Sequence, residues 1–164
     1  MEITPITAED FARFWPTFRA IVQARETYAL DPELTYEQAY RLWCEQPQFS
    51  FVARAGDEVL GGYYLKPNAA GPGDHICNCG YMVAAEARGR GVARALCEHS
   101  QRVARQAGYR GMQFNAVVAS NHAAIRLWRS LGFSIVGTVP DAYRHAREGL
   151  VDAHIMYKRL TDEP

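Results

Sequence analysis

The chain has 164 residues, 48% of them apolar, which suits one compact domain with a full core, so we expect a single domain over residues 1–164. Its 18 lysine and arginine residues balance 18 aspartate and glutamate residues, which argues against a general nucleic-acid-binding protein. No apolar run approaches the roughly 20 residues that span a bilayer. The acidic N-terminus also lacks the build of a signal peptide, so the sequence predicts a cytoplasmic protein without membrane contact.

Four cysteines are present, and we expect free thiols because a domain of this size and composition needs no disulfide bonds. Two of them, Cys77 and Cys79, share one face of a predicted strand with His75. Such a row is able to ligate zinc, but the sequence offers no second ligand pair at a suitable spacing. We therefore predict no metal site.

Two helices are predicted in the N-terminal third, each opened by a capping box, in which two residues three positions apart bond each other's backbone. Residues 7–10 open the first helix, which continues to about residue 22. Residues 35–38 open a short second helix, in which aromatic residues from Tyr36 to Trp43 recur at helical spacing. A loop that contains Glu26 connects the two helices.

Three strands are predicted next. Residues 49–54 and 59–65 form a hairpin around a turn at residues 55–58. A loop rich in proline and glycine follows at residues 66–73, and a third strand covers residues 76–83. Because this loop precedes the strand that leads to the glycine-rich segment described below, we expect it at the rim of a site.

The C-terminal half alternates helices and strands. A helix begins at Gly91 and ends before Gly108, and a strand covers residues 112–118. Another helix begins after Ser120 or Asn121 and is closed by Gly132, and two strands follow at residues 133–139 and 154–157. Hairpins early and strand–helix–strand units late predict an α/β fold, a mixed sheet with helices on its faces.

An anion-binding segment is predicted at residues 88–93, between a strand and a helix. Its glycines let the backbone approach a ligand closely, and the first N–H groups of a helix have no partners within the helix. Two arginines add positive charge for the same ligand. A dinucleotide-binding fingerprint is disfavoured, because Arg94 stands where that motif has its third glycine.

Two segments together resemble the Gcn5-related N-acetyltransferase (GNAT) superfamily, and the resemblance spans nearly the whole chain. Residues 88–93 fit its Arg/Gln-x-x-Gly-x-Gly/Ala acyl-CoA loop. Residues 121–133 fit its Asn-x-x-Ala-x-x-Leu-Tyr segment with the Gly-Phe that follows. Local phrases around Pro67 and Pro140 also resemble a bacterial branch of that superfamily.

The resemblance implies an acetyl-CoA-dependent N-acetyltransferase with a mostly antiparallel sheet of about six to seven strands and helices on both faces. It also implies a splay between the fourth and fifth strands of the family's sheet, which in this chain are the strands predicted at residues 76–83 and 112–118. Acetyl-CoA is the implied co-substrate. The implied cofactor-binding residues lie in the third predicted strand, the glycine-rich loop and the last predicted helix: Met82, Val83, Arg88, Gly89, Arg90, Gly91, Val92, Ala93, Asn121 and Trp128. The loop amides would bind the pyrophosphate, and the strand end and Asn121 the pantetheine arm.

The expected acceptor is a primary amine of a small molecule. A peptide or protein acceptor, or a CoA-binding module without catalysis, stays an alternative. A homodimer through the last strands is also expected. Arg144 and Arg147 either hold an acceptor carboxylate as planar forks or are solvated charges.

The proton donor and acceptor are the least determined part of the site. The family often has a tyrosine at the position of Trp128 to protonate the departing thiolate, and indole offers no useful acidity. Tyr143, in a predicted loop after the strand at residues 133–139, is the candidate acid, and Glu26 is the candidate base.

Four further residues are weighed for roles in catalysis. His75 and His145 are the alternatives to a carboxylate base. Asn78 interrupts an apolar strand beside the implied thioester channel, as Asn115 does in the next strand, so each amide bonds backbone, water or substrate. We predict that Asn78 is catalytic.

Overall fold

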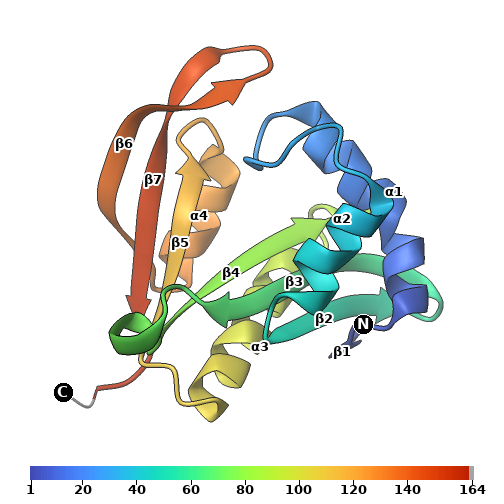
Figure 1. The fold of residues 1–164 in the computed structure, drawn as a ribbon, viewed down its shortest axis with the longest axis horizontal. Coiled ribbons are helices and arrows are strands. Elements are labelled where there is room, and N and C mark those ends of the chain that lie inside the picture. Colours follow the sequence, from blue (N-terminus) through green and yellow to red (C-terminus); the bar gives the residue numbers. More distant parts are fainter. Residues whose placement is uncertain (163–164) are drawn as a thin grey trace.

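A seven-stranded sheet in the order β1-β2-β3-β4-β5-β7-β6 forms the centre of the protein (Figure 1). The computed structural model describes residues 1–162. The strands are β1 (Glu2–Pro5), β2 (Phe49–Ala55), β3 (Glu58–Pro67), β4 (Ile76–Val83), β5 (Gly111–Val118), β6 (Ser134–His145) and β7 (Gly149–Arg159). Neighbouring strands are antiparallel except for β4 and β5, which are parallel. The predicted α/β fold and mixed sheet are confirmed.

Helices cover both faces of this sheet. They are α1 (Ala8–Ala24), α2 (Tyr36–Tyr40), α3 (Val92–Gln106) and α4 (His122–Ser130), with a π-helical turn η1 (Arg41–Glu45) after α2 and short 3-10 turns η2 (Gly71–Gly73) and η3 (Ala85–Ala87). A Cβ atom on Gly61 would lie 3.4 Å from Leu96 of α3, whereas one on Gly62 would lie 3.8 Å from Trp43 of η1. Because successive strand residues point to opposite faces, α3 and η1 lie on opposite sides of β3.

Two buried clusters fill the space between the helices and the sheet. One lies under α1, α2 and η1 and is built largely of aromatic rings, among them Phe11, Phe14, Phe18 and Trp43. The other lies under α3 and α4 and includes Leu96, Met112, Phe114 and Trp128. Each helix therefore buries an apolar stripe against the sheet, which stabilises the layered arrangement.

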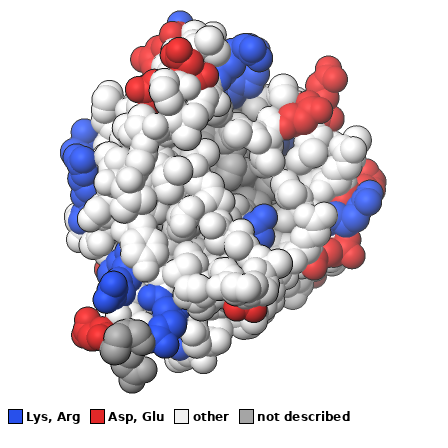
Figure 2. All heavy atoms as spheres, turned by 60° about the vertical axis from the view of Figure 1, so that its left-hand side comes forward, with Lys and Arg blue, Asp and Glu red and all other residues white. Residues whose placement is uncertain are grey.

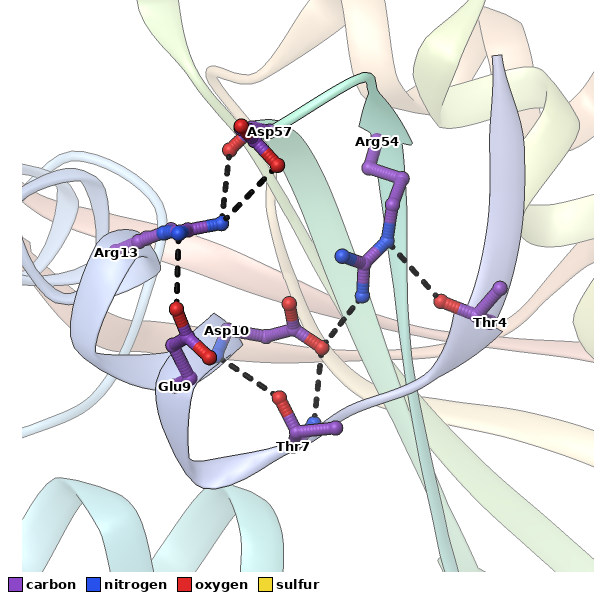
Figure 3. Close-up of polar contacts among 7 residues, drawn as sticks. All are labelled: Thr4, Thr7, Glu9, Asp10, Arg13, Arg54 and Asp57. Atoms are coloured by element: carbon purple, nitrogen blue, oxygen red, sulfur yellow. Dashed lines mark hydrogen bonds and ion pairs between the residues drawn. The ribbon is translucent and has the colours of Figure 1, made fainter.

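The predicted capping boxes begin α1 and α2. At α1, the backbone N–H of Asp10 donates to Thr7 Oγ1 at 3.1 Å, and the Thr7 N–H donates to Asp10 Oδ2 at 3.0 Å. Arg54 of β2 approaches the same carboxylate at 2.6 Å and donates to Thr4 Oγ1 at 3.3 Å, as Figure 3 shows. One carboxylate thus joins the start of α1 to β2.

The structure differs from the sequence prediction at three places. β1 is an additional edge strand of four residues, too short and proline-terminated to stand out in the sequence. β6 and β7 are longer than predicted, because the ladder continues past a bulge between Val139 and Tyr143, where Asp141 has a φ of 52°. Pro140 and Asp141 read as a strand end in the sequence, so Tyr143 lies in β6 and not in a loop as predicted.

The four cysteines are free thiols, and Cys77, Cys79 and Cys97 are buried in the core. In the part of the chain that the structure describes, no helix is long and apolar enough to cross a membrane.

Candidate active site

A cleft of about 450 Å³ opens where β4 and β5 separate. These parallel strands pair only from Ile76 to Asn78 on β4, opposite Gly111 to Gln113 on β5. We call the point after Asn78 and Gln113 the fork, and it confirms the predicted splay between the fourth and fifth strands. Figure 2 shows a hollow in the protein surface, which is surrounded mainly by uncharged residues.

The cleft is lined from both faces of the sheet. What we call its α1–α2 end is lined by Leu30, Trp43, Tyr64 and Lys66. What we call its α3–α4 end is lined by Arg88, Ala93, Asn121 and Trp128. Because these two sets come from layers on opposite faces, the cleft connects the two faces through the fork.

Part of the backbone of β4 faces this cleft. Hydrogen bonds from Ala84 N to Leu60 O and from Asn68 N to Ile76 O, both 2.8 Å, identify the residues of β4 that bond to β3. Bonded and non-bonded pairs alternate in an antiparallel ladder, so Tyr81 and Val83 direct their N–H and C=O groups away from β3 and toward the gap.

Met82 and Val83, the two strand residues predicted to bind pantetheine, differ in the direction of their backbone groups. Val83 presents backbone groups to the cleft. The same register directs the backbone of Met82 to Gly62 of β3, and its side chain is buried in the cluster under α1. Both residues line the cleft, but only Val83 is oriented to extend the sheet with a ligand.

The glycine-rich loop has the geometry of an anion site. Gly89 and Gly91 both have a φ of +77°, a conformation that residues with a Cβ rarely adopt. The first backbone bond inside α3 runs from Ala95 N to Gly91 O at 3.1 Å, so the earlier N–H groups of the helix are left for a ligand. Arg88 and Arg90 are exposed beside them, while the Val92 side chain is buried in the core and holds the loop by packing.

Asn121 and Trp128 place α4 along the cleft. Asn121 is the N-cap of α4, and its Oδ1 accepts from Ala124 N at 3.3 Å. The Trp128 ring is 8% exposed and lies 5.0 Å from the ring of Tyr81 and 5.1 Å from that of Phe114. The indole therefore forms an apolar wall of the α3–α4 end.

Asn78 lies at the fork itself and is 5% exposed. Its Nδ2 donates to the carbonyl of Gln113 at 2.9 Å, and its Oδ1 accepts from the Tyr64 hydroxyl at 3.1 Å. The side chain thus ties β4 to β5 at their last paired position while one face borders the cleft. On β5, Asn115 is exposed, and its Nδ2 donates to Asn68 Oδ1 at 2.8 Å.

The predicted base and acid lie beside the cleft, and the residues between 1 and 162 that line it include neither. Glu26 pairs with Arg147 at 3.3 Å, and the Tyr143 hydroxyl donates to the Tyr28 carbonyl at 3.1 Å. The backbone N–H of Ala146 donates to the Arg25 carbonyl at 3.0 Å. Together these contacts hold the β6–β7 hairpin against the loop between α1 and α2, which approach each other in Figure 1.

The two candidate histidines also lie outside this lining. His75 is exposed in the turn before β4. His145 is buried, and its Nδ1 accepts from the backbone N–H groups of Arg147 at 3.1 Å and Glu148 at 3.2 Å. Within residues 1–162, no group of three or more His, Cys, Asp or Glu side chains is placed to hold a metal ion.

Sequence reasoning did not single out Tyr28 and Lys66, which both line the cleft. The Tyr28 hydroxyl donates to the Tyr81 carbonyl at 2.8 Å, and a Cβ on Gly80 would lie 2.9 Å from that hydroxyl. A glycine inside a strand is a signal of such a close approach. Lys66 follows Tyr64 by two residues, which places both on one face of β3.

Burial keeps the phenols of the cleft protonated. It raises the pKa of Tyr64 to about 12 and raises the pKa of Tyr28 and Tyr81 well above the ordinary value. At neutral pH these side chains are therefore neutral hydrogen-bond donors.

The combination of a forked sheet, a glycine-rich helix start and a cleft between them defines an acyl-CoA-binding fold. Residues 13–133 match the acetyltransferase (GNAT) family. A Gcn5-related N-acetyltransferase from Kribbella flavida is 46% identical, with a TM-score of 0.91 and 96% of each chain covered. The chain therefore belongs to the GNAT acetyltransferase family, which confirms the resemblance, the N-acetyltransferase class and the family's donor, acetyl-CoA.

Two further relatives are informative. N-acetyltransferase aca1 of Schizosaccharomyces pombe is 41% identical over 98 residues, which cover 59% of this chain and 47% of that protein. The match thus spans about half the length of the fission-yeast protein. A putative acetyltransferase, yncA from Salmonella typhimurium, solved with acetyl-CoA, shares the fold at 20% identity, with a TM-score of 0.84, 100% of this chain covered and 96% of that chain.

Proposed function

We propose that residues 1–164 act as a single domain that transfers the acetyl group of acetyl-CoA to a primary amine of a small-molecule acceptor. The observation that carries this proposal is the cleft through the fork, which gives donor and acceptor separate entrances and a common meeting point. Acetyl-CoA enters from the α3–α4 end, and the acceptor enters from the α1–α2 end.

The donor is held by backbone groups as well as by charge. The first N–H groups of α3 and the guanidinium of Arg88 bind the pyrophosphate. The pantetheine arm pairs with Val83 and contacts Asn121 and Trp128, which line that end. These assignments bring the thioester to the fork, next to Tyr81.

Acetyl transfer proceeds by direct attack on the thioester. The amine nitrogen forms a bond with the carbonyl carbon, the carbon–sulfur bond breaks, the nitrogen loses a proton and the CoA thiolate gains one. Backbone N–H groups of β4 that face the gap stabilise the negative charge on the carbonyl oxygen. Since the described residues lining the cleft include no Asp, Glu or His, we assign the proton transfer from the amine to water.

The predicted catalytic residues then divide into two roles. Asn78 keeps its place at the reacting centre, because it borders the cleft at the fork. Glu26 and Tyr143 act as positioning residues, because both join the α1–α2 loop to the β6–β7 hairpin. This contact holds the loop whose residues Tyr28 and Leu30 line the α1–α2 end of the cleft.

Incubation of the protein with acetyl-CoA and a panel of primary amines, with release of free CoA thiol as the readout, tests the proposal. Acetylated product from at least one small amine, above the rate of hydrolysis, is the expected result. Tight binding of acetyl-CoA without any turnover would instead favour a CoA-binding module, and turnover of peptide N-termini alone would favour a peptide acetyltransferase. A cytoplasmic location and a homodimer through the last strands remain predictions of the same proposal.

A further inference from the structure

The charged residues of the cleft are few and all positive. Among the described residues that line it, Lys66 and Arg88 carry charge, and there is no carboxylate. Arg88 belongs to the glycine-rich loop at the α3–α4 end, where the proposed function assigns it to the pyrophosphate. Lys66 is therefore the cation of the α1–α2 end, where the acceptor is proposed to bind.

Lys66 is partly buried, and its ammonium has no carboxylate partner among the residues that the structure describes. In the part of the chain that the structure describes, the basic side chains found in ion pairs do not include Lys66. Its Nζ lies 5.4 Å from the centroid of the Tyr64 ring. A cation over an aromatic face is stabilised only weakly, so a partly desolvated ammonium here still attracts an anion.

The distance between the Lys66 ammonium and the fork limits the size of a molecule that binds the ammonium and reaches the fork at the same time. Lys66 pairs with Asn78 across β3 and β4, and Tyr81 is three residues further along β4. At about 3.3 Å per residue, this is about 10 Å between the backbones of Asn78 and Tyr81. The Lys66 side chain leans toward Tyr64, and Tyr64 pairs with Gly80 on β4. The distance from the ammonium to Tyr81 is therefore shorter than the distance between the backbones.

Other cations near the acceptor entrance are placed less well. Arg147 is paired with Glu26, and Arg144 is exposed on the hairpin. Neither is among the described residues that line the cleft. An acceptor with a second positive charge would also find no carboxylate among the described residues that line the cleft.

Resting on the proposed function, we propose that the acceptor is a compact amino acid, whose carboxylate binds the Lys66 ammonium while its amine reaches the thioester at the fork. Lys66 then determines specificity and takes no part in the chemistry. Asn78 and Asn115 also line the cleft, and the Nδ2 of each donates one hydrogen bond, so a second N–H group of each remains for the same carboxylate.

The test compares α-amino acids and short ω-amino acids with their own carboxamides, in the wild-type protein and in Lys66→Met, Lys66→Arg and Arg144→Met. For wild type, kcat/KM should favour the acid over its amide by roughly 10- to 100-fold, the effect of a charge-assisted hydrogen bond. Lys66→Met should remove this preference by raising KM for the acid, while KM for acetyl-CoA stays unchanged. Lys66→Arg should restore part of the preference, and the exposed control Arg144→Met should keep it.

Equal turnover of acid and amide by the wild-type protein would overturn the inference and leave the proposed function intact. A Lys66→Met protein that loses activity on acid and amide alike, or binds acetyl-CoA more weakly, would show a structural role for the lysine and overturn it as well.

A binding measurement keeps the two proposals separate if no amine is acetylated. With CoA present, the fluorescence of Trp43 and Trp128, which line the cleft, reports ligand binding. Binding of an amino acid but not its amide, lost in Lys66→Met, would support the carboxylate site even though the proposed function had failed. Equal binding of acid and amide, or no binding of either, would overturn it.

Discussion

The hydroxyl of Tyr28 donates a hydrogen bond to the main-chain carbonyl of Tyr81 at 2.8 Å. This bond joins the loop between α1 and α2 to the strand that borders the cleft. Since the Tyr28 carbonyl also accepts from the Tyr143 hydroxyl at 3.1 Å, one residue links the β6–β7 hairpin to the fork.

Replacing Tyr28 with Phe should weaken acceptor binding while leaving donor binding unchanged. The substitution removes the donor and leaves the Tyr81 carbonyl without this partner, at a cost of about 1–3 kcal/mol in the free energy of unfolding. We expect KM for the amine to rise several-fold, measured with saturating acetyl-CoA, and the urea midpoint to fall. An unchanged urea midpoint together with a raised KM for acetyl-CoA would contradict this assignment.

Gly80 to Ala should disrupt the α1–α2 end of the cleft. The added Cβ would lie 2.5 Å from Tyr64 Cε1 and 2.9 Å from the Tyr28 hydroxyl, so both rings would have to move. We expect kcat/KM for the amine to fall by at least about tenfold with acetyl-CoA affinity retained. Gly137 is the matched control on β6, because the nearest atom to its added Cβ is Ile155 Cδ1 at 3.9 Å, and Gly137→Ala should keep normal activity.

Gly89 to Ala should weaken the binding of acetyl-CoA. Its φ of +77° costs a residue with a Cβ about 1–2 kcal/mol, so the loop would relax away from the geometry that presents its amides. Gly56, with a φ of +59° in the β2–β3 turn, carries comparable strain far from the loop. Calorimetric titration with CoA should show a weaker Kd for Gly89→Ala alone, and equal losses in Gly56→Ala would refute a local role.

Trp128 to Phe should distinguish packing from acid catalysis. If the indole is an apolar wall, the variant keeps kcat within about threefold and raises KM for acetyl-CoA, because no acidic proton has been removed. The pH dependence of kcat should retain its shape. A tenfold loss of kcat with a shifted basic limb would instead identify Trp128 with proton transfer.

The Asp10–Arg54 pair should make the stability of the fold depend on acid pH. Burial raises the pKa of Asp10, but hydrogen bonds from Thr7 and the ion pair with Arg54 outweigh it and bring the pKa below its ordinary value of 3.8. A lowered pKa in the folded state stabilises the protein above the unfolded pKa, and this contribution is lost as pH falls through the folded value. Asp10→Asn should therefore lower the free energy of unfolding at pH 7 by about 1–3 kcal/mol and flatten its decline below about pH 4. Urea titrations between pH 3 and 7 measure the free energy of unfolding and its dependence on pH. If this dependence has the same shape in wild type and Asp10→Asn, the pair is not a source of acid sensitivity.

Features with a local cause were predictable from the sequence. The capping boxes at Thr7 and Thr35 and the helix cap at Asn121 each depend on a few adjacent residues, and the sequence contains those residues. Features that depend on tertiary placement were not predictable in this way. Tyr28 and Lys66 border the cleft because loops and strands distant in sequence meet there.

Tyr143 shows why the distinction matters. Pro140 and Asp141 are typical of the end of a strand. Neither the bulge that contains them nor the pairing of Tyr143 with Val151 beyond it has a signature in the sequence. The residue was therefore predicted in a loop, whereas its strand holds the hydroxyl on the Tyr28 carbonyl.

In the proposed function, the short ladder between β4 and β5 sets the depth at which the two substrates meet. Because only three residues of β4 pair with β5, each further pair would close the gap by about 3.3 Å, and Asn78 occupies the last of these positions. The depth of the fork in the cleft thus depends on the number of paired residues in the sheet and not on the length of the loops. Variation in the surrounding loops can change which acceptor enters without moving the place where the bond is made.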